Sequence, residues 1–199
     1  MFPLSTVLFP GAGLALHVFE PRYRALVADC LAGDGAFGVV LIARGSEVGG
    51  GDERVSVGTE AGIEIAQPLP DGRWRLLARG RRPIEVQTWT GEDPYPRAVV
   101  GDVIDPGEPS PERLDQAARS VRRAFALASE LGAGPSSPDD QPLAAAMAEA
   151  AWQLCARAPL GPLDHQRLLE ATGPDDRLAL FVELVDAVSE DLARLLSHG

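Results

Sequence analysis

MFPLSTVLFPGAGLALHVFEPRY, residues 1–23, contains the signals around which the rest of the chain is organised. Two short apolar runs precede Pro10-Gly11, a pair typical of a turn because proline fixes φ and glycine tolerates conformations that other residues avoid. From Leu14 the side chains alternate between two faces, which predicts a strand. Pro21 ends that strand. Because proline is favoured in the first turn of a helix, Glu20-Pro21 predicts a strand-to-helix junction.

Four motifs in this stretch resemble the N-terminal substrate-binding domain of Lon proteases. They are Pro3-Leu4, residues 7–11 (VLFPG), Leu14-Ala15-Leu16 and residues 19–23 (FEPRY). Their order and spacing are similar to small bacterial proteins that consist of this domain alone. The resemblance implies a barrel similar to the PUA fold, with a structural motif formed by Pro3, Leu4, Pro10, Gly11, Glu20 and Pro21.

The next segments predict a β-rich body with one early helix. A glycine-rich loop is expected at 45–52, and Pro68 to Gly72 are typical of a hairpin turn. Short strands separated by turns favour a small β-barrel or sandwich over an α/β sheet. The expected strands are 37–43, 55–58, 63–65, 73–79, 84–89 and 97–104, with an interruption at 80–83.

Strand signals stop at a proline-rich boundary, residues 105–111, and helical periodicity follows. Ser110-Pro111 is typical of a helix N-cap and first turn. Helices are expected at 111–131, 142–158, 162–171 and 174–197, with a linker at 132–141. The fold class is therefore α+β, with a β-barrel-like subdomain at 1–105 and a helical bundle at 106–199. Residues 166–170 (QRLLE) and Arg177-Leu178 also resemble the family, so the resemblance covers nearly the whole chain.

Composition restricts the partners and the location. The chain has 199 residues, 45% of them hydrophobic, and a formal net charge of −11, which repels phosphate backbones and anionic lipid surfaces. The first residues carry no basic leader, and the longest strongly apolar run, 37–43, is far shorter than the roughly 20 residues that span a bilayer. We therefore expect a cytoplasmic protein that does not bind membranes, and the charge disfavours nucleic acid as a partner.

Catalytic signatures are absent from the sequence. Lon proteases add an ATPase and a peptidase domain whose chemistry depends on lysine, and all 18 basic residues of this chain are arginine. The two cysteines and three histidines show no ligand spacing, and no G-x-S-x-G occurs. Residues 33–38 match G-x-G-x-x-G, but a helix precedes them and a strand follows, the reverse of a dinucleotide site. We expect no enzyme activity, no catalytic residue, no cofactor and no metal.

The family resemblance implies a non-catalytic module that binds polypeptides. The expected partner is an unfolded or degron-bearing polypeptide, with a protease as a further candidate. Aromatic and arginine side chains dominate peptide-binding surfaces, and on that basis the candidate contact residues are Phe9, Arg22, Tyr23, Trp74 and Trp89. Their exposure discriminates between this role and a structural one, because buried rings cannot contact a client.

The alternative function is RNA binding through the barrel. An arginine stripe beside Trp74 suits a single-stranded backbone with stacked bases; its members are Arg73, Arg75, Arg79, Arg81 and Arg82. The balance of 10 arginines against 14 acids in residues 1–105 argues against it. A small-molecule sensor resembling cereblon is a third alternative, but the chain has no counterpart of the zinc cysteines of that ligand cage.

Overall fold

The computed structural model describes residues 1–45, 53–132 and 142–198. The chain divides into two compact units, Met1–Ile104 and Asp105–Gly199. Most of the glycine-rich loop expected at 45–52 and of the linker expected at 132–141 lies outside the described residues.

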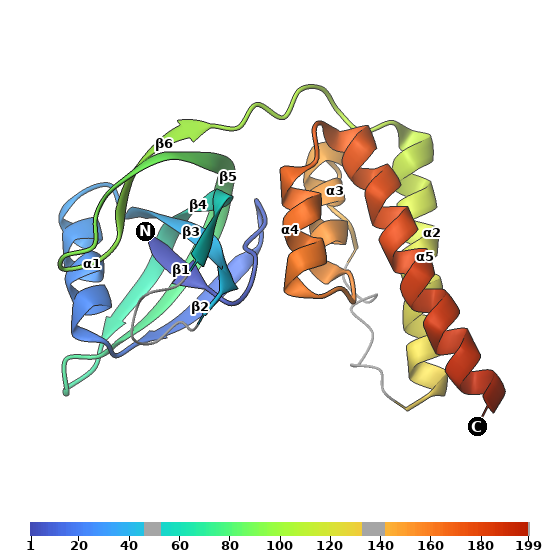
Figure 1. The fold of residues 1–199 in the computed structure, drawn as a ribbon, viewed down its shortest axis with the longest axis horizontal. Coiled ribbons are helices and arrows are strands. Elements are labelled where there is room, and N and C mark those ends of the chain that lie inside the picture. Colours follow the sequence, from blue (N-terminus) through green and yellow to red (C-terminus); the bar gives the residue numbers. More distant parts are fainter. Residues whose placement is uncertain (46–52, 133–141, 199) are drawn as a thin grey trace. The chain divides into compact units, whose positions relative to one another are not determined.

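One mixed sheet forms the first unit (Figure 1). The strand order is β1-β3-β4-β5-β2. β6 also pairs with β5, along a later stretch of that strand than the one that pairs with β2. Only β1 runs parallel to its neighbour, β3, among the described strands. The strands are β1 (Phe2–Leu4), β2 (Gly13–Val18), β3 (Ala36–Arg44), β4 (Glu53–Pro68), β5 (Trp74–Gly91) and β6 (Arg97–Asp102).

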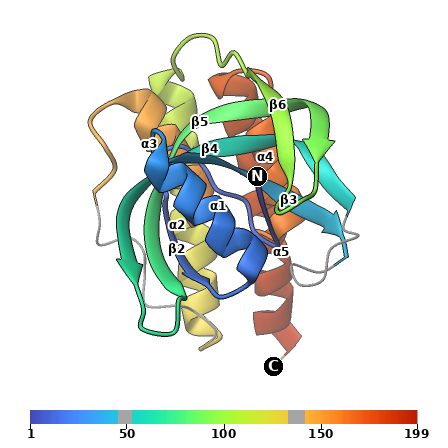
Figure 2. The same cartoon turned by 90° about the vertical axis from the view of Figure 1, so that its left-hand side faces the viewer.

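Helix α1 (Pro21–Ala32) lies across the curled sheet (Figure 2). It begins with Pro21 in its first turn, as the sequence predicts. Its buried side chains, Tyr23, Leu26 and Val27, pack with the inward residues of the sheet into one hydrophobic core. The early helix therefore closes one side of the β body.

β4 and β5 are long continuous strands where the sequence predicted shorter, interrupted ones. Gly80 lies inside β5 because another part of the backbone passes against it: a Cβ there would lie 2.2 Å from the Phe9 carbonyl oxygen. The Gly11 N–H donates to the Gly80 carbonyl, and the Gly80 N–H donates to the Ala12 carbonyl, both at 2.9 Å. This glycine marks a close backbone approach and not the end of a strand.

β1 and β2 stand at the two ends of the sheet order, and no pairing joins them in the part of the chain that the structure describes. The hydrogen bond from the Gly80 N–H to the Ala12 carbonyl shows which residues of β2 direct their backbone groups toward β5. In an antiparallel pair the backbone groups of alternate residues face the partner strand. Those of Gly13, Ala15 and His17 therefore point away from β5, and we call them the β2 edge.

The second unit is all helical, with α2 (Pro111–Glu130), α3 (Met147–Arg157), α4 (Pro162–Glu170) and α5 (Pro174–His198). The long helices α2 and α5 pack side by side (Figure 1), and Ser120 donates to Asp186 across them at 2.6 Å. The sequence predicted α3 from residue 142, but it begins at Met147, and the Gln153 side chain accepts the Ala144 N–H at 2.9 Å. Ser110 precedes α2 without capping it, because its hydroxyl contacts Asp175.

A buried arginine organises the helical unit. Arg177 on α5 is 2% exposed, and its guanidinium lies 3.6 Å from the centroid of the Trp152 ring on α3. Its Nε donates to the Leu168 carbonyl of α4 at 3.1 Å. Its terminal nitrogens pair with Asp105, just before α2. One side chain thus ties together three helices and the segment that leads into the fourth.

Candidate functional site

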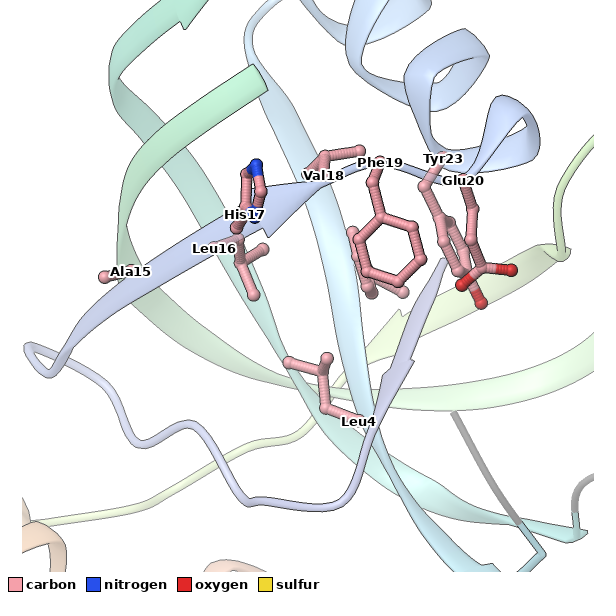
Figure 3. Close-up of a pocket in the computed structure, with 9 residues that line it drawn as sticks. Leu4, Ala15, Leu16, His17, Val18, Phe19, Glu20 and Tyr23 are labelled. Atoms are coloured by element: carbon pink, nitrogen blue, oxygen red, sulfur yellow. The ribbon is translucent and has the colours of Figure 1, made fainter. Parts of the chain in front are cut away.

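A cavity of about 190 Å³ lies between the end strands β1 and β2 (Figure 3). We call it the seam pocket. Apolar side chains form most of its wall, and His17, Glu20 and Tyr23 contribute polar groups. Its lining residues are Phe2, Leu4, Ala15, Leu16, His17, Val18, Phe19, Glu20 and Tyr23.

Stacked aromatic rings form one wall of the seam pocket. The rings of Phe2 and Tyr23 lie 4.1 Å apart at an interplanar angle of 11°. The Arg22 guanidinium lies 4.5 Å from the Tyr23 ring centroid, and its Nε donates to Glu20 at 3.0 Å. Because the stack is held between the core and an ion pair, this wall is pre-organised.

Phe19 is the exposed element of the pocket. Its side chain follows β2 and lies in the space between the two end strands (Figure 3), yet 52% of its surface is open to solvent. The His17 ring lies 6.3 Å from it, centroid to centroid. A large aromatic ring at the mouth of an apolar cavity is a suitable contact for an incoming side chain.

An exposed apolar row continues from β2 onto the outer face of the sheet. Ile65 on β4 is the register partner of Leu77 on β5, and Leu77 is the partner of Ala15 on β2. Ile65 is 57% exposed and Leu77 is 37% exposed. We call these three residues the outer row. It reaches the β2 edge, directly beside the seam pocket.

Several residues singled out from the sequence meet at this pocket. Leu4, Glu20 and Tyr23 line it, and Arg22 covers the Tyr23 ring. Trp74 is half-buried at the start of β5 as the register partner of Val18, and it does not itself line the pocket. Tyr23 is 3% exposed, so it can present only the part of its ring that faces the cavity.

Two of the five candidate contact residues lie elsewhere. Phe9 is 2% exposed, so its ring belongs to the interior and cannot contact a client. Trp89 is half-buried opposite Ala98 on β6, and the Arg54 guanidinium lies 4.7 Å from its ring centroid. Neither residue lines the seam pocket.

The structural motif residues surround the same region. Pro3 is the register partner of Val40, and Leu4 is buried beside it on β1. Pro10-Gly11 forms the expected turn, with Gly11 at a φ of +77°, a conformation that favours glycine. This turn lets the chain pass from the β1 end of the sheet to β2.

Sequence reasoning missed Phe19, Leu77 and Ile65 as candidate contacts. Leu77 carried a signal, since it is the one apolar residue on a face otherwise formed by arginines. Ile65 is exposed because the pairing of β4 with β5 shifts register between Ile63 and Ile65. Such a bulge turns a side chain to the opposite face, and simple alternation cannot reveal it.

Carboxylates balance most of the arginine stripe on β5. Arg73 pairs with Asp71 and Arg79 with Glu64, each at 2.6 Å. Glu60 lies 3.6 Å from Arg81 and 2.7 Å from Arg82. The stripe therefore offers little uncompensated positive charge to a phosphate backbone.

Both cysteines are held as thiols. Burial raises the pKa of Cys155 to about 12 and also raises the pKa of Cys30 above its usual value. A protonated thiol is a weak nucleophile and a poor metal ligand. The described residues contain no cluster of three or more His, Cys, Asp or Glu side chains arranged to hold a metal ion. Among them, no helix is both long and apolar enough to cross a membrane.

A mixed six-stranded sheet with one early helix, followed by an all-helical unit, defines an α+β protein of the Lon N-terminal domain class. The family model of the ATP-dependent protease La (LON) substrate-binding domain matches residues 1–187, and the chain belongs to this family. The match covers the substrate-binding domain, which is the non-catalytic part of Lon.

Solved structures and curated relatives agree with this assignment. The crystal structure of a Lon N-terminal domain protein from Xanthomonas campestris is 30% identical, with a TM-score of 0.67 over 92% of this chain and 95% of that one. The N-terminal domain of a Mycobacterium avium complex Lon protease shares the fold at 17% identity and a TM-score of 0.59, over 92% of this chain and 96% of that one. Lon protease 2 of Herpetosiphon aurantiacus is 28% identical over 88% of this chain, which spans 22% of that protein's length.

Proposed function

We propose that this chain is a non-catalytic recognition module that binds apolar segments of unfolded or degron-bearing polypeptides at the seam pocket and the outer row. Membership of a substrate-binding domain family supports a polypeptide as the partner. The observation that carries the choice of site is Phe19, a half-exposed aromatic ring at the mouth of an apolar cavity.

The chemistry of the site suits apolar side chains. The stacked wall of Phe2 and Tyr23 is fixed before a client arrives, so binding costs little ordering of the protein. Burying one leucine or phenylalanine side chain contributes about 1.5–3 kcal/mol, which supports weak and reversible capture. RNA binding lacks a comparable observation, since ion pairs engage Arg73, Arg79, Arg81 and Arg82.

We further propose that recognition by this chain serves proteolysis carried out by another domain or another polypeptide. The support is the family itself and the relatives that are proteases by name. In this arrangement the chain holds the client, and peptide hydrolysis occurs at a site that residues 1–199 do not supply.

The test compares Phe19→Ser with Leu195→Ser, which changes a similarly exposed apolar residue on α5. Binding of a fluorescein-labelled, reduced and alkylated protein that cannot refold is measured by fluorescence anisotropy. We expect Phe19→Ser to raise Kd at least fivefold and Leu195→Ser to leave it unchanged. Equal affinities for both variants and the parent chain would remove the seam pocket from the proposal.

The non-catalytic part of the proposal has its own test. Fluorescein-labelled casein is incubated with the purified chain, with and without ATP and magnesium, and released peptide fluorescence is followed over hours. We expect no release above a buffer control. Reproducible turnover would show that this chain carries a hydrolytic site.

A further inference from the structure

The β2 edge presents hydrogen-bonding groups that no other strand uses among the residues that the structure describes. The backbone N–H and C=O groups of Gly13, Ala15 and His17 point away from β5, and β1 does not pair with them. A row of unpaired backbone groups is a template for one more strand. In place of water, another extended backbone can satisfy the alternating donors and acceptors along such an edge.

The position of the seam pocket matches the side-chain alternation of a strand added along the β2 edge. Side chains alternate across a sheet, so an added residue opposite Leu16 would share the inward face of Leu16 and Val18, which line the pocket. Its two neighbours would lie opposite Ala15 and His17, and the backbone groups of those two residues point toward the added strand. Backbone pairing and insertion of one side chain are therefore compatible.

Length and charge restrict the occupant further. β2 has 6 residues, so it can pair with a segment of about 20 Å, at roughly 3.3 Å per residue. The net charge of the chain is −11, which favours a segment with basic flanks and repels an acidic one. The outer row adds apolar contact for an outward residue opposite Ala15.

We propose that the client binds as an additional β-strand along the β2 edge, with one apolar side chain opposite Leu16 in the seam pocket and basic residues on either side. This inference rests on the proposed function and specifies its binding mode. The recognised feature is an extended backbone with a single apolar anchor, so many unrelated sequences satisfy it.

The primary test scans backbone methylation along a fluorescein-labelled peptide, KTTLTTK, whose single leucine fixes the register. N-methylation removes one N–H and adds bulk at that position only. If the peptide pairs antiparallel to β2, methylation of either residue next to the leucine raises Kd about tenfold, and methylation of the leucine itself changes Kd less than twofold. A parallel strand reverses this alternation and equally supports the proposal.

A second test changes the protein. His17→Pro removes one N–H of the β2 edge without removing a bond to β5, and His17→Ala removes the side chain but keeps that N–H. Because both variants lose the imidazole, the comparison isolates the N–H, and we expect the Kd of His17→Pro for KTTLTTK to be at least tenfold higher than that of His17→Ala. Thermal unfolding of both variants establishes that they are folded. If His17→Pro fails to fold, the methylation scan still tests the proposal, because it uses the unchanged protein.

The outcomes separate the two proposals. If the unfolded protein binds and Phe19→Ser weakens it, but methylation of KTTLTTK shows no alternation or the peptide does not bind, strand addition is overturned and the proposed function stands. If neither ligand binds, the proposed function fails. If sedimentation shows a dimer that His17→Pro converts to a monomer, a second copy occupies the edge, and the proposal is overturned.

Discussion

The guanidinium of Arg177 pairs with both carboxylate oxygens of Asp105, at 3.1 and 2.8 Å, while its flat face lies over the Trp152 ring. This is a charge taken almost completely out of water, and its partners come from α3, from the end of α4 and from the segment before α2. Arg177 belongs to a sequence pattern that resembles the family, and its contacts give that pattern a structural role.

Removing the partner of this buried charge should destabilise the helical unit. Asp105→Ala leaves the Arg177 guanidinium without its carboxylate, and breaking a buried pair in this way costs about 3 kcal/mol or more. Asp191→Ala, which breaks an exposed pair with Arg194 on α5, should cost less than about 1 kcal/mol. Urea unfolding of both variants measures the difference, and similar midpoints would contradict a buried role for the pair.

Tyr23→Ala should act on stability more than on recognition. The ring is buried and stacked on Phe2, so its removal leaves a cavity in the core and lowers the free energy of unfolding by about 3–5 kcal/mol. Phe19→Ser removes a half-exposed ring four residues earlier and should lower it by less than about 1 kcal/mol. Chemical denaturation distinguishes them; equal losses would mean that Phe19 also belongs to the core.

Gly80→Ala should destabilise the β unit. The added Cβ would meet the Phe9 carbonyl oxygen at 2.2 Å, and because that atom belongs to the backbone it cannot rotate away. We expect a loss of about 1–3 kcal/mol, typical of overpacking. Gly91→Ala on the same strand meets nothing within 4 Å and serves as the control. Thermal melts of the two variants should separate; coincident melts would show that the turn region moves aside freely.

The free energy of unfolding should decrease as the pH falls below about 6.5. Burial lowers the pKa of His165 below its ordinary value of 6.5, so the unfolded chain binds protons in a pH range where the folded chain does not. The contribution of His165 to stability is thus full above pH 6.5 and is lost as the pH falls through its folded pKa. His165→Leu should flatten this part of the profile.

The amino group of Met1 changes stability in the same direction and must be separated from His165. Burial lowers the pKa of this group from 8.0 to about 6, so stability should also rise between pH 6 and 8. The His165→Leu variant keeps the Met1 contribution, and the difference between the two pH profiles isolates the histidine. Profiles that superimpose would contradict the assignment to His165.

Local signals were sufficient to predict most elements of the fold. The Glu20-Pro21 junction, the Pro10-Gly11 turn and the strong periodicity of α5 each appear in the structure where the sequence indicates them. These features depend on the φ preference of proline or glycine, or on a repeated apolar face. Both can be recognised without knowledge of distant contacts.

The pocket could not be predicted from the same signals. Alternation along β2 assigns its side chains to the two faces of the sheet. It does not reveal that β2 lies at one end of the strand order or that β1, at the other end, does not pair with it. From the sequence, Gly80 indicates the end of a strand. The contact that requires a glycine there is with the Phe9 backbone, which is far away in the sequence. Aromatic content alone led to Phe9, which is buried, while the exposed ring at the site is Phe19.

The pairing of β1 with β3, and of β2 with residues 74–79 of β5, has a consequence during synthesis. Phe2, Leu4 and Leu8 leave the ribosome long before the strands that cover them, so these side chains remain in water while the intervening chain is made. The β unit can close only once β5 has emerged. The chain that we propose to bind apolar segments therefore exposes several of its own during synthesis, and we expect it to depend on chaperones until the β unit has closed.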